Sequence, residues 1–311
     1  MGPVRCLMVS MALALEEPPR LSAGARVALV ASSGPLRDAA ELAHAVTNAR
    51  SFGWDPIIGS HALARDGYFA GSDALRAADL LDAIGNRRVD GIWCLRGGYG
   101  AARLLSALPI DLLRAHPKVL LGYSDITALH AAWQRAGLIS FHGPTARASL
   151  SDFSRESLRR TIVNGSSDAS AMSDAVTLRD GTATGRLAGG NLALVASLCG
   201  TPWAIDFRDA IVVLEDVNEA TYRIDRMLLQ LRLAGAFHGC AGFLFGQFTD
   251  CPPESDDGAR SLWAVTRECA DACGVPAVLG APVGHVADQW TLPLGALATL
   301  DASSRTLALH R

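Results

Sequence analysis

One segment near the middle of the chain, residues 118–133, constrains the fold more than any other. Its apolar run Val119-Leu120-Leu121 stops at a glycine, Tyr123-Ser124-Asp125 follows, and apolar residues then recur with helical spacing. This order predicts a buried strand that turns sharply into a helix. Such a turn exposes its central residue at the carboxyl end of a sheet and directs the free N–H groups of the helix towards it. Ser124 could therefore be a nucleophile, or Ser124 and Asp125 could simply cap the helix.

The first half of the chain alternates short apolar runs with helical patterns. Strands are expected at 26–31, 54–58 and 89–95, and helices at 38–52, 73–84 and 101–108. This alternation predicts an α/β fold with a doubly wound parallel sheet and ligand sites at the carboxyl ends of its strands.

The pattern changes after residue 150. Residues 151–184 are rich in Ser, Asp, Thr and Gly with little periodicity, which predicts a connection between two domains. Strands expected at 210–214, 242–248 and 277–279 then mix with helices at 191–198 and 222–233. We therefore expect an N-terminal extension (1–20), an α/β nucleophile domain (21–150), a linker (151–184) and a smaller β-rich C-terminal domain (185–311).

Composition excludes several classes of function. Half of the 311 residues are apolar and 19% are charged, so a sizeable core is expected. A net charge of −3 without a basic cluster argues against nucleic-acid binding. The seven cysteines are scattered without a CxxC pair, which disfavours a disulfide framework or a zinc site and favours the reducing cytoplasm. No apolar run reaches the roughly 18 residues that a membrane span needs, so no membrane is expected. The cysteine spacing likewise gives no reason to expect a metal.

A glycine-rich loop, Arg96-Gly97-Gly98-Tyr99-Gly100, follows an expected strand and opens a helix. Glycines permit positive φ and close backbone approach, so the loop's N–H groups could bind an anion or a developing oxyanion. A tight strand–helix turn without a ligand is the alternative. The loop is neither a G-x-G-x-x-G fingerprint nor a P-loop, so no nucleotide cofactor is expected.

A serine hydroxyl needs a base to take its proton, and the base needs an acceptor that fixes its tautomer. Ser124, His285 in a Gly-preceded loop, and Glu215 at a strand end supply one group of each kind. The rival histidines are His142 and His130, of which His130 is expected to pack or cap. Glu215 could instead be a salt-bridged loop anchor.

Six separated motifs in this order resemble one family. They are VALVASSGPL, LRGGYGAARLL, LLGYSDITALH, FHGPT, LEDVNEATYRIDRMLLQL and GHVADQWTLPLG. Together they resemble the LD-carboxypeptidases of the muramoyl-tetrapeptide type, the serine peptidase family that also contains the microcin C7 self-immunity peptidases. The resemblance covers about residues 21–311.

The resemblance implies a Ser124 nucleophile, with Glu215 and His285 completing a catalytic triad. The oxyanion donors would be the backbone N–H groups of Gly98 and Asp125. An α/β N-terminal domain and a β-rich C-terminal domain would meet at the site, in a cytoplasmic homodimer without a cofactor.

The substrate class implied is a murein peptide with a terminal D-amino acid, such as the D-alanine of a murein tetrapeptide. Arg223 is a candidate for binding the terminal carboxylate. The alternative substrate is a peptidyl-aminoacyl-nucleotide, as in the immunity branch, but no extra loop is evident near 185–203. A non-catalytic sugar- or nucleotide-binding module would leave the coincidence of Ser, Glu and His unexplained.

Overall fold

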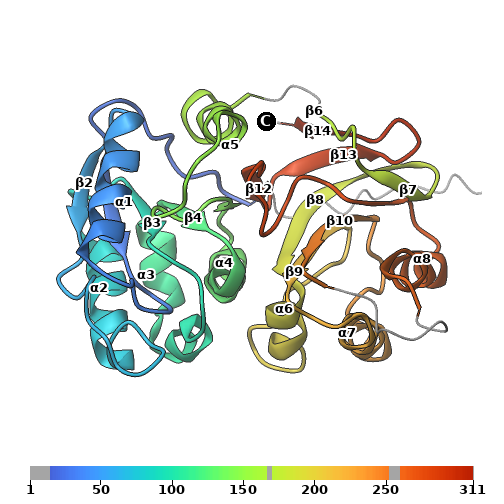
Figure 1. Cartoon of the computed structure of the whole chain (residues 1–311), viewed down its shortest axis with the longest axis horizontal. Helices are drawn as coiled ribbons and strands as arrows, with labels where there is room; N and C mark the ends of the chain where they lie inside the picture. The colour runs from blue at the N-terminus through green and yellow to red at the C-terminus, as the bar shows by residue number, and fades with distance from the viewer. Residues whose placement is uncertain (1–14, 167–169, 252–259, 311) are drawn as a thin grey trace, which may run out of the picture.

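The computed structural model describes residues 15–166, 170–251 and 260–310. Two sheets lie side by side, one built mainly from the first half of the chain and one from the second (Figure 1). Most of the expected extension, residues 1–20, lies outside the described residues. Its last part contacts the first sheet's layer, since Glu16 exchanges backbone hydrogen bonds with Gly137 and Ile139.

The first sheet has six strands in the order β12-β5-β4-β3-β1-β2. Five are parallel and β12 is antiparallel to β5. The strands are β1 (Arg26–Val30), β2 (Asp55–Ile58), β3 (Gly91–Cys94), β4 (Val119–Gly122), β5 (Ser140–His142) and β12 (Leu292–Leu294). The winding direction reverses between β1 and β3, which is the position at which ligands commonly bind in doubly wound sheets.

Helices cover both faces of this sheet, which confirms the predicted doubly wound architecture. The apolar sides of α1 (Ala39–Ser51) and α5 (Asp152–Leu158) enter the core on one face. The other face packs against α2 (Asp73–Gly85), α3 (Ile110–Ala115), α4 (Thr127–Ala136) and the 3-10 helix η1 (Ala101–Ala107). The helix expected at 101–108 is therefore a tighter 3-10 helix.

The second sheet has eight strands of mixed direction in the order β6-β14-β13-β8-β9-β10-β11-β7. They are β6 (Ser170–Ala171), β7 (Val176–Arg179), β8 (Thr182–Asn191), β9 (Ala210–Val217), β10 (Gly242–Thr249), β11 (Ala277–Leu279), β13 (Leu297–Asp301) and β14 (Thr306–His310). One face packs against α6 (Leu192–Leu198), α7 (Thr221–Leu233) and α8 (Leu262–Cys273). The other face shares a core with β12 and the residues before it.

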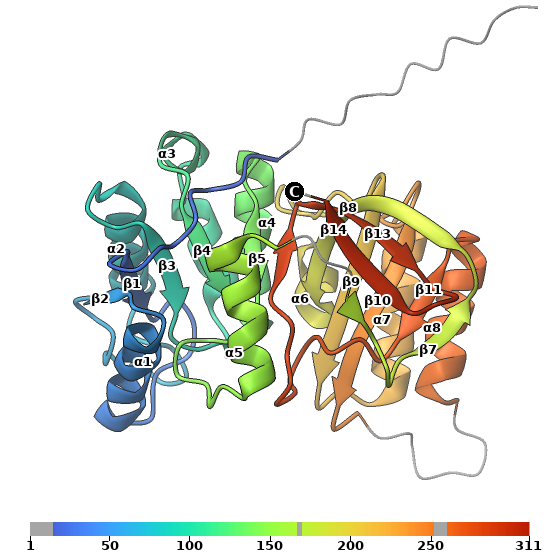
Figure 2. The same ribbon diagram turned by 90° about the horizontal axis from the view of Figure 1, so that it is seen from above.

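The two sheets are oriented alike. Seen from above, β3 of the first sheet and β9 and β10 of the second run in the same direction (Figure 2). Their carboxyl ends therefore open towards the same side of the molecule.

Two features differ from the simplest expectation. Residues 151–184 are not irregular throughout, because they contain α5, the π-helix η3 (Arg159–Asn164), β6 and β7. Each of these elements is too short to show a clear hydrophobic period. In addition, β12 comes from the C-terminal part of the chain but pairs with β5, so the two halves share a sheet.

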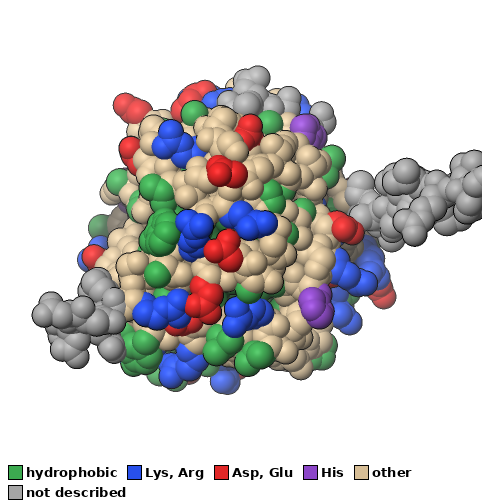
Figure 3. Space-filling view, turned by 90° about the vertical axis from the view of Figure 1, so that its right-hand side faces the viewer, with side chains coloured by type: hydrophobic (Ala, Val, Ile, Leu, Met, Phe, Trp, Pro, Cys, Tyr) green, Lys and Arg blue, Asp and Glu red, His purple; other side chains and the backbone are tan. Residues whose placement is uncertain are grey.

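The surface over the C-terminal half carries arginine and acidic side chains interspersed (Figure 3). Ion pairs such as Arg260 with Asp225 and Arg267 with Asp271 involve residues of α7 and α8. No helix among the described residues is both long and apolar enough to cross a membrane.

Candidate active site

Three side chains from distant parts of the chain form one hydrogen-bonded row. His285 Nδ1 lies 2.8 Å from Glu215 Oε2, and His285 Nε2 lies 3.1 Å from Ser124 Oγ. Glu215 is fully buried in β9, while Ser124 and His285 are partly exposed. If Nδ1–H donates to Glu215, the lone pair of Nε2 faces the serine hydroxyl. This arrangement suits proton transfer from Ser124 to His285.

Ser124 occupies a strained turn between β4 and α4. Its φ is +65°, a left-handed conformation that costs a non-glycine residue free energy. A short 3-10 helix, η2 (Ser124–Ile126), leads from this turn into α4, and neither η2 nor α4 has a side-chain cap. The Ser124 hydroxyl points instead to His285, so the capping alternative does not describe this turn.

The carboxylate of Asp125 ties the nucleophile turn to two neighbouring loops. Its Oδ2 accepts hydrogen bonds from Ser33 Oγ at 2.6 Å and from the Ala101 N–H at 2.8 Å. Burial raises the pKa of Asp125, and these two hydrogen bonds oppose the rise. The loops after β1 and β3 are thereby held against the turn.

The glycine-rich loop lies directly beside Ser124. A Cβ added to Gly97 would come within 2.9 Å of Ser124 Cβ, so only glycine fits without a shift. Gly98 has a φ of +120°, and among the described residues its N–H donates to no protein acceptor. The backbone N–H groups of Gly98 and Asp125 thus belong to segments that meet at the nucleophile.

The loop bearing His285 is held from several sides. The ring of Tyr123 lies 4.8 Å from the imidazole, and the Thr249 hydroxyl donates to the His285 carbonyl at 3.0 Å. Burial raises the pKa of Tyr123 to about 12, with a further contribution from the charge of Glu215. Gly284 has a φ of +116°, and a Cβ there would meet Glu215 Oε2 at 2.7 Å. Tyr123 was not predicted to contact the histidine, although it directly precedes the serine.

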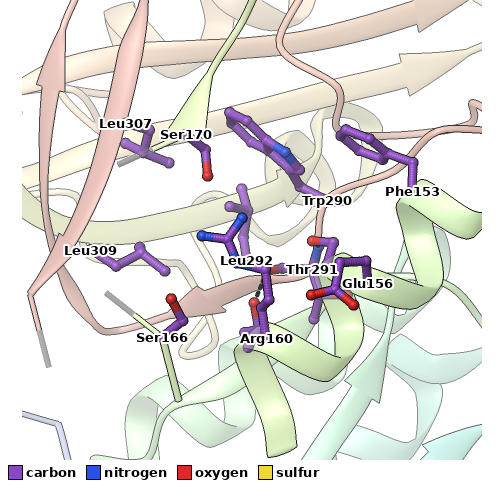
Figure 4. Close-up of a pocket in the computed structure, with 12 residues that line it drawn as sticks. Phe153, Glu156, Arg160, Ser166, Ser170, Trp290, Thr291, Leu292, Leu307 and Leu309 are labelled. Atoms are coloured by element: carbon purple, nitrogen blue, oxygen red, sulfur yellow. Dashed lines mark hydrogen bonds between the residues drawn. The ribbon is translucent and has the colours of Figure 1, made fainter. Parts of the chain in front are cut away.

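A pocket of about 220 Å³ lies against residues 290–292, which directly follow this loop (Figure 4). The helical segment α5–η3 forms one wall, and β12, β14 and Trp290 form the opposite wall. Ser154 and Ser157 of α5 accept hydrogen bonds from the N–H groups of Gln289 and Thr291. None of the three residues in the hydrogen-bonded row lines this pocket, but its walls support the loop that carries His285.

The acidic neighbour of Glu215 has a different environment. Asp216 accepts hydrogen bonds from Asn191 Nδ2 and from the Ala193 N–H, each at 2.9 Å, and burial raises its pKa to about 6. The N–H of Asn191 donates to Thr127 Oγ1 at 2.9 Å, which joins β8 to the first turn of α4. Asp216 and Asn191 therefore connect the second sheet to the nucleophile helix.

The rival histidines lie in the core. His130 contacts Ser140 Oγ at 2.9 Å and the Gly122 carbonyl at 3.0 Å, and burial lowers its pKa to about 4. His142 is fully buried, and burial lowers its pKa well below the ordinary value. Burial therefore keeps both rings neutral at neutral pH. His130 packs, as expected.

Arg223 is placed at the start of α7 with its own partners. It pairs with Glu219 at 3.6 Å and donates to the Tyr222 hydroxyl at 3.2 Å, with about half of its side chain exposed (51%). These contacts do not include any residue of the hydrogen-bonded row. Its role in binding a carboxylate stays a prediction. Among the described residues, no group of three or more His, Cys, Asp or Glu side chains is arranged to hold a metal ion.

Family models match both halves of the chain. Residues 27–143 match the LD-carboxypeptidase N-terminal domain, and residues 184–300 match the LD-carboxypeptidase C-terminal domain. A Streptomyces coelicolor protein assigned to the carboxypeptidases is 41% identical over 308 residues, covering 96% of this chain and 97% of its own. The murein tetrapeptide carboxypeptidase of Pseudomonas aeruginosa is 34% identical over 291 residues, covering 89% and 94%.

Solved structures extend the similarity to three dimensions. The muramoyltetrapeptide carboxypeptidase from Oxalobacter formigenes has a TM-score of 0.81 at 30% identity, covering 91% of this chain and 97% of that one. In the sequence comparison, the microcin C7 self-immunity protein of Escherichia coli is 25% identical over 293 residues, covering 83% of this chain and 84% of its own. The two domain models match residues 27–143 and 184–300, and relatives at over 30% identity cover up to 96% of the sequence, so this chain belongs to the LD-carboxypeptidase family.

Proposed function

We propose that this protein is a serine carboxypeptidase that cleaves the amide between an L-centre and a terminal D-amino acid, releasing D-alanine from murein tetrapeptides. The observation that carries the proposal is the row from Glu215 through His285 to Ser124, with links of 2.8 and 3.1 Å. The relatives named for murein tetrapeptides support the substrate class.

In the proposed acylation step, Ser124 Oγ attacks the scissile carbonyl while its proton passes to His285 Nε2. Glu215 stabilises the resulting imidazolium through Nδ1–H. The N–H groups of Gly98 and Asp125 would bind the tetrahedral oxyanion, an interaction often worth about 3–4 kcal/mol per donor. His285 then protonates the leaving nitrogen, D-alanine departs, and the peptide remains as an ester on Ser124.

Deacylation repeats the same roles with water. His285 takes a proton from the water that attacks the ester, a second tetrahedral intermediate forms, and Ser124 recovers its proton as the tripeptide acid leaves. The proposal needs no cofactor. It also includes a cytoplasmic setting, supported by the free cysteines among the described residues, and a homodimer, which only the family resemblance supports.

The test is release of D-alanine from a murein tetrapeptide by the wild type and by Ser124→Ala. We expect release by the wild type and a loss of kcat of roughly 10⁴-fold or more in the variant. Unfolding curves of both proteins show whether the variant is folded. Release by neither folded protein would favour the microcin-type substrate, and equal release by both would remove Ser124 from the mechanism.

A further inference from the structure

Four arginines gather at the edge of the first sheet where Ser124 lies. Arg37 follows β1, Arg65 follows β2, Arg96 follows β3 and Arg147 follows β5. Since parallel strands end on the same side, these side chains share the carboxyl edge of the sheet with the nucleophile turn.

One carboxylate, that of Glu41, pairs with two of the four guanidinium groups. Glu41 binds Arg37 Nε at 2.7 Å and Arg147 Nη1 at 2.8 Å. Within the described part of the chain, Arg96 and Arg65 donate to backbone carbonyls of the loop after β1, at 2.6 and 2.8 Å. The nearby carboxylate of Asp38 caps α1 through two N–H groups. The cluster therefore has an excess of positive charge.

Two of these arginines are poorly satisfied. Burial lowers the pKa of Arg96, and the neighbouring charge of Arg147 lowers it further. Arg147 has 30% of its side chain exposed, and its Nε is buried without a hydrogen-bond acceptor among the described residues. A bound anion would offset the repulsion between these charges.

Both arginines border the proposed catalytic groups. Arg96 directly precedes Gly97, which touches Ser124, and its Nε lies 3.6 Å from the place of a Cβ on Gly34 in the adjoining loop. The charge of Arg147 acts on Tyr123, whose ring packs on His285. The excess charge thus adjoins the glycine-rich loop and Tyr123, which both flank Ser124.

We propose that Arg96 and Arg147 bind the free terminal carboxylate of the substrate, a role for which the sequence offers Arg223 as a candidate. This inference rests on the proposed carboxypeptidase function and identifies how its substrates are selected. A guanidinium fork matches a carboxylate in geometry and charge. Anchoring the carboxylate there would place the amide one residue upstream at the nucleophile.

The experiment compares a murein tetrapeptide that has a free terminal carboxylate with the same peptide amidated at its C-terminus. The wild type should prefer the acid by roughly 10- to 100-fold in kcat/KM. R96Q and R147Q should each lose most of that preference, mainly through a higher KM for the acid, with little change on the amide. R147K and R96K, which keep the charge but lose the fork, should fall between.

R37Q is the matched control, because it removes a charge from the same Glu41 partner while its side chain is 76% exposed. It should change the acid preference by less than about threefold. Unfolding curves of all variants identify any folding defect. If R147Q fails to fold, R147K still tests the role of the guanidinium fork, because its charge can pair with Glu41.

The proposal is overturned if R96Q and R147Q slow the acid and the amide equally, or if R223Q rather than these variants abolishes the preference. A wild type that releases no D-alanine from the acid would instead refute the proposed function, and this inference with it. Preserved wild-type release with unaffected variants would refute the carboxylate site alone.

Discussion

Replacing Gly97 by alanine tests how closely the glycine-rich loop positions the nucleophile. The new Cβ would lie 2.9 Å from Ser124 Cβ and 3.0 Å from Ser124 Oγ, with the Tyr123 carbonyl at 3.4 Å. Carbon atoms normally pack about 3.5–4.0 Å apart, so the serine must retreat by roughly 0.5–1 Å. The φ of Gly97 is not positive, so alanine adds no backbone strain there.

A shift of this size would lengthen or misalign the 3.1 Å contact between Ser124 and His285. Misplacement by about 1 Å can reduce turnover by about 10²-fold, so we expect Gly97→Ala to lower kcat for D-alanine release by that order. Overpacking should cost about 1–3 kcal/mol of the free energy of unfolding, which leaves the protein folded.

The assay is D-alanine release under saturating tetrapeptide, together with urea unfolding of each variant. Gly85→Ala is the control, since Gly85 ends α2 and a Cβ there meets only Leu112 at 4.0 Å. It should leave kcat unchanged. Wild-type turnover by folded Gly97→Ala would refute the idea that this loop sets the position of Ser124.

Two further predictions concern buried groups. Glu215→Gln keeps the shape but removes the charge that stabilises protonated His285, so kcat should drop by roughly 10³–10⁴-fold with folding retained; turnover within tenfold of the wild type would contradict this role. The folded-state pKa of His130 is about 4, below its ordinary value of 6.5, so the unfolded state binds more protons and stability is lost as the pH falls from 6.5 through 4. His130→Asn should reduce this acid-induced loss by up to about 3 kcal/mol in urea unfolding. The raised pKa values of Asp216 and Asp125 act in the opposite direction, but they do so in both proteins. A pH dependence of stability equal to that of the wild type would show that His130 does not contribute.

Local patterns were enough to predict the doubly wound sheet and the turn at Ser124. The apolar run of β4, its glycine end and the helical spacing after it specify a strand–turn–helix unit within about fifteen residues. The same kind of signal located β3 and its glycine-rich loop. The need for a nucleophile, a base and an acidic partner, together with the family motifs, also pointed to Ser124, Glu215 and His285. Each of these residues stands in a short polar stretch after or between apolar segments.

Other features could not be derived from local sequence. β9 continues through Glu215 and Asp216, because these polar groups are buried against partners far along the chain, and an apolar-run criterion ends the strand too early. β12 pairs with β5 of the first sheet. The periodicity of a three-residue strand cannot show which sheet it joins.

Local sequence patterns specify the strands, turns and helices of this protein and the kinds of reactive groups that they carry. The tertiary structure decided which groups meet: Ser124 and His285 are 161 residues apart, and Glu215 and His285 are 70 apart. It also decided that Arg223 pairs with Glu219, just before α7, while Arg96 and Arg147 share the carboxyl edge of the sheet that carries Ser124. Hydrophobic periodicity reports only how each segment buries its own apolar face, whereas distances between segments depend on how all the faces pack together.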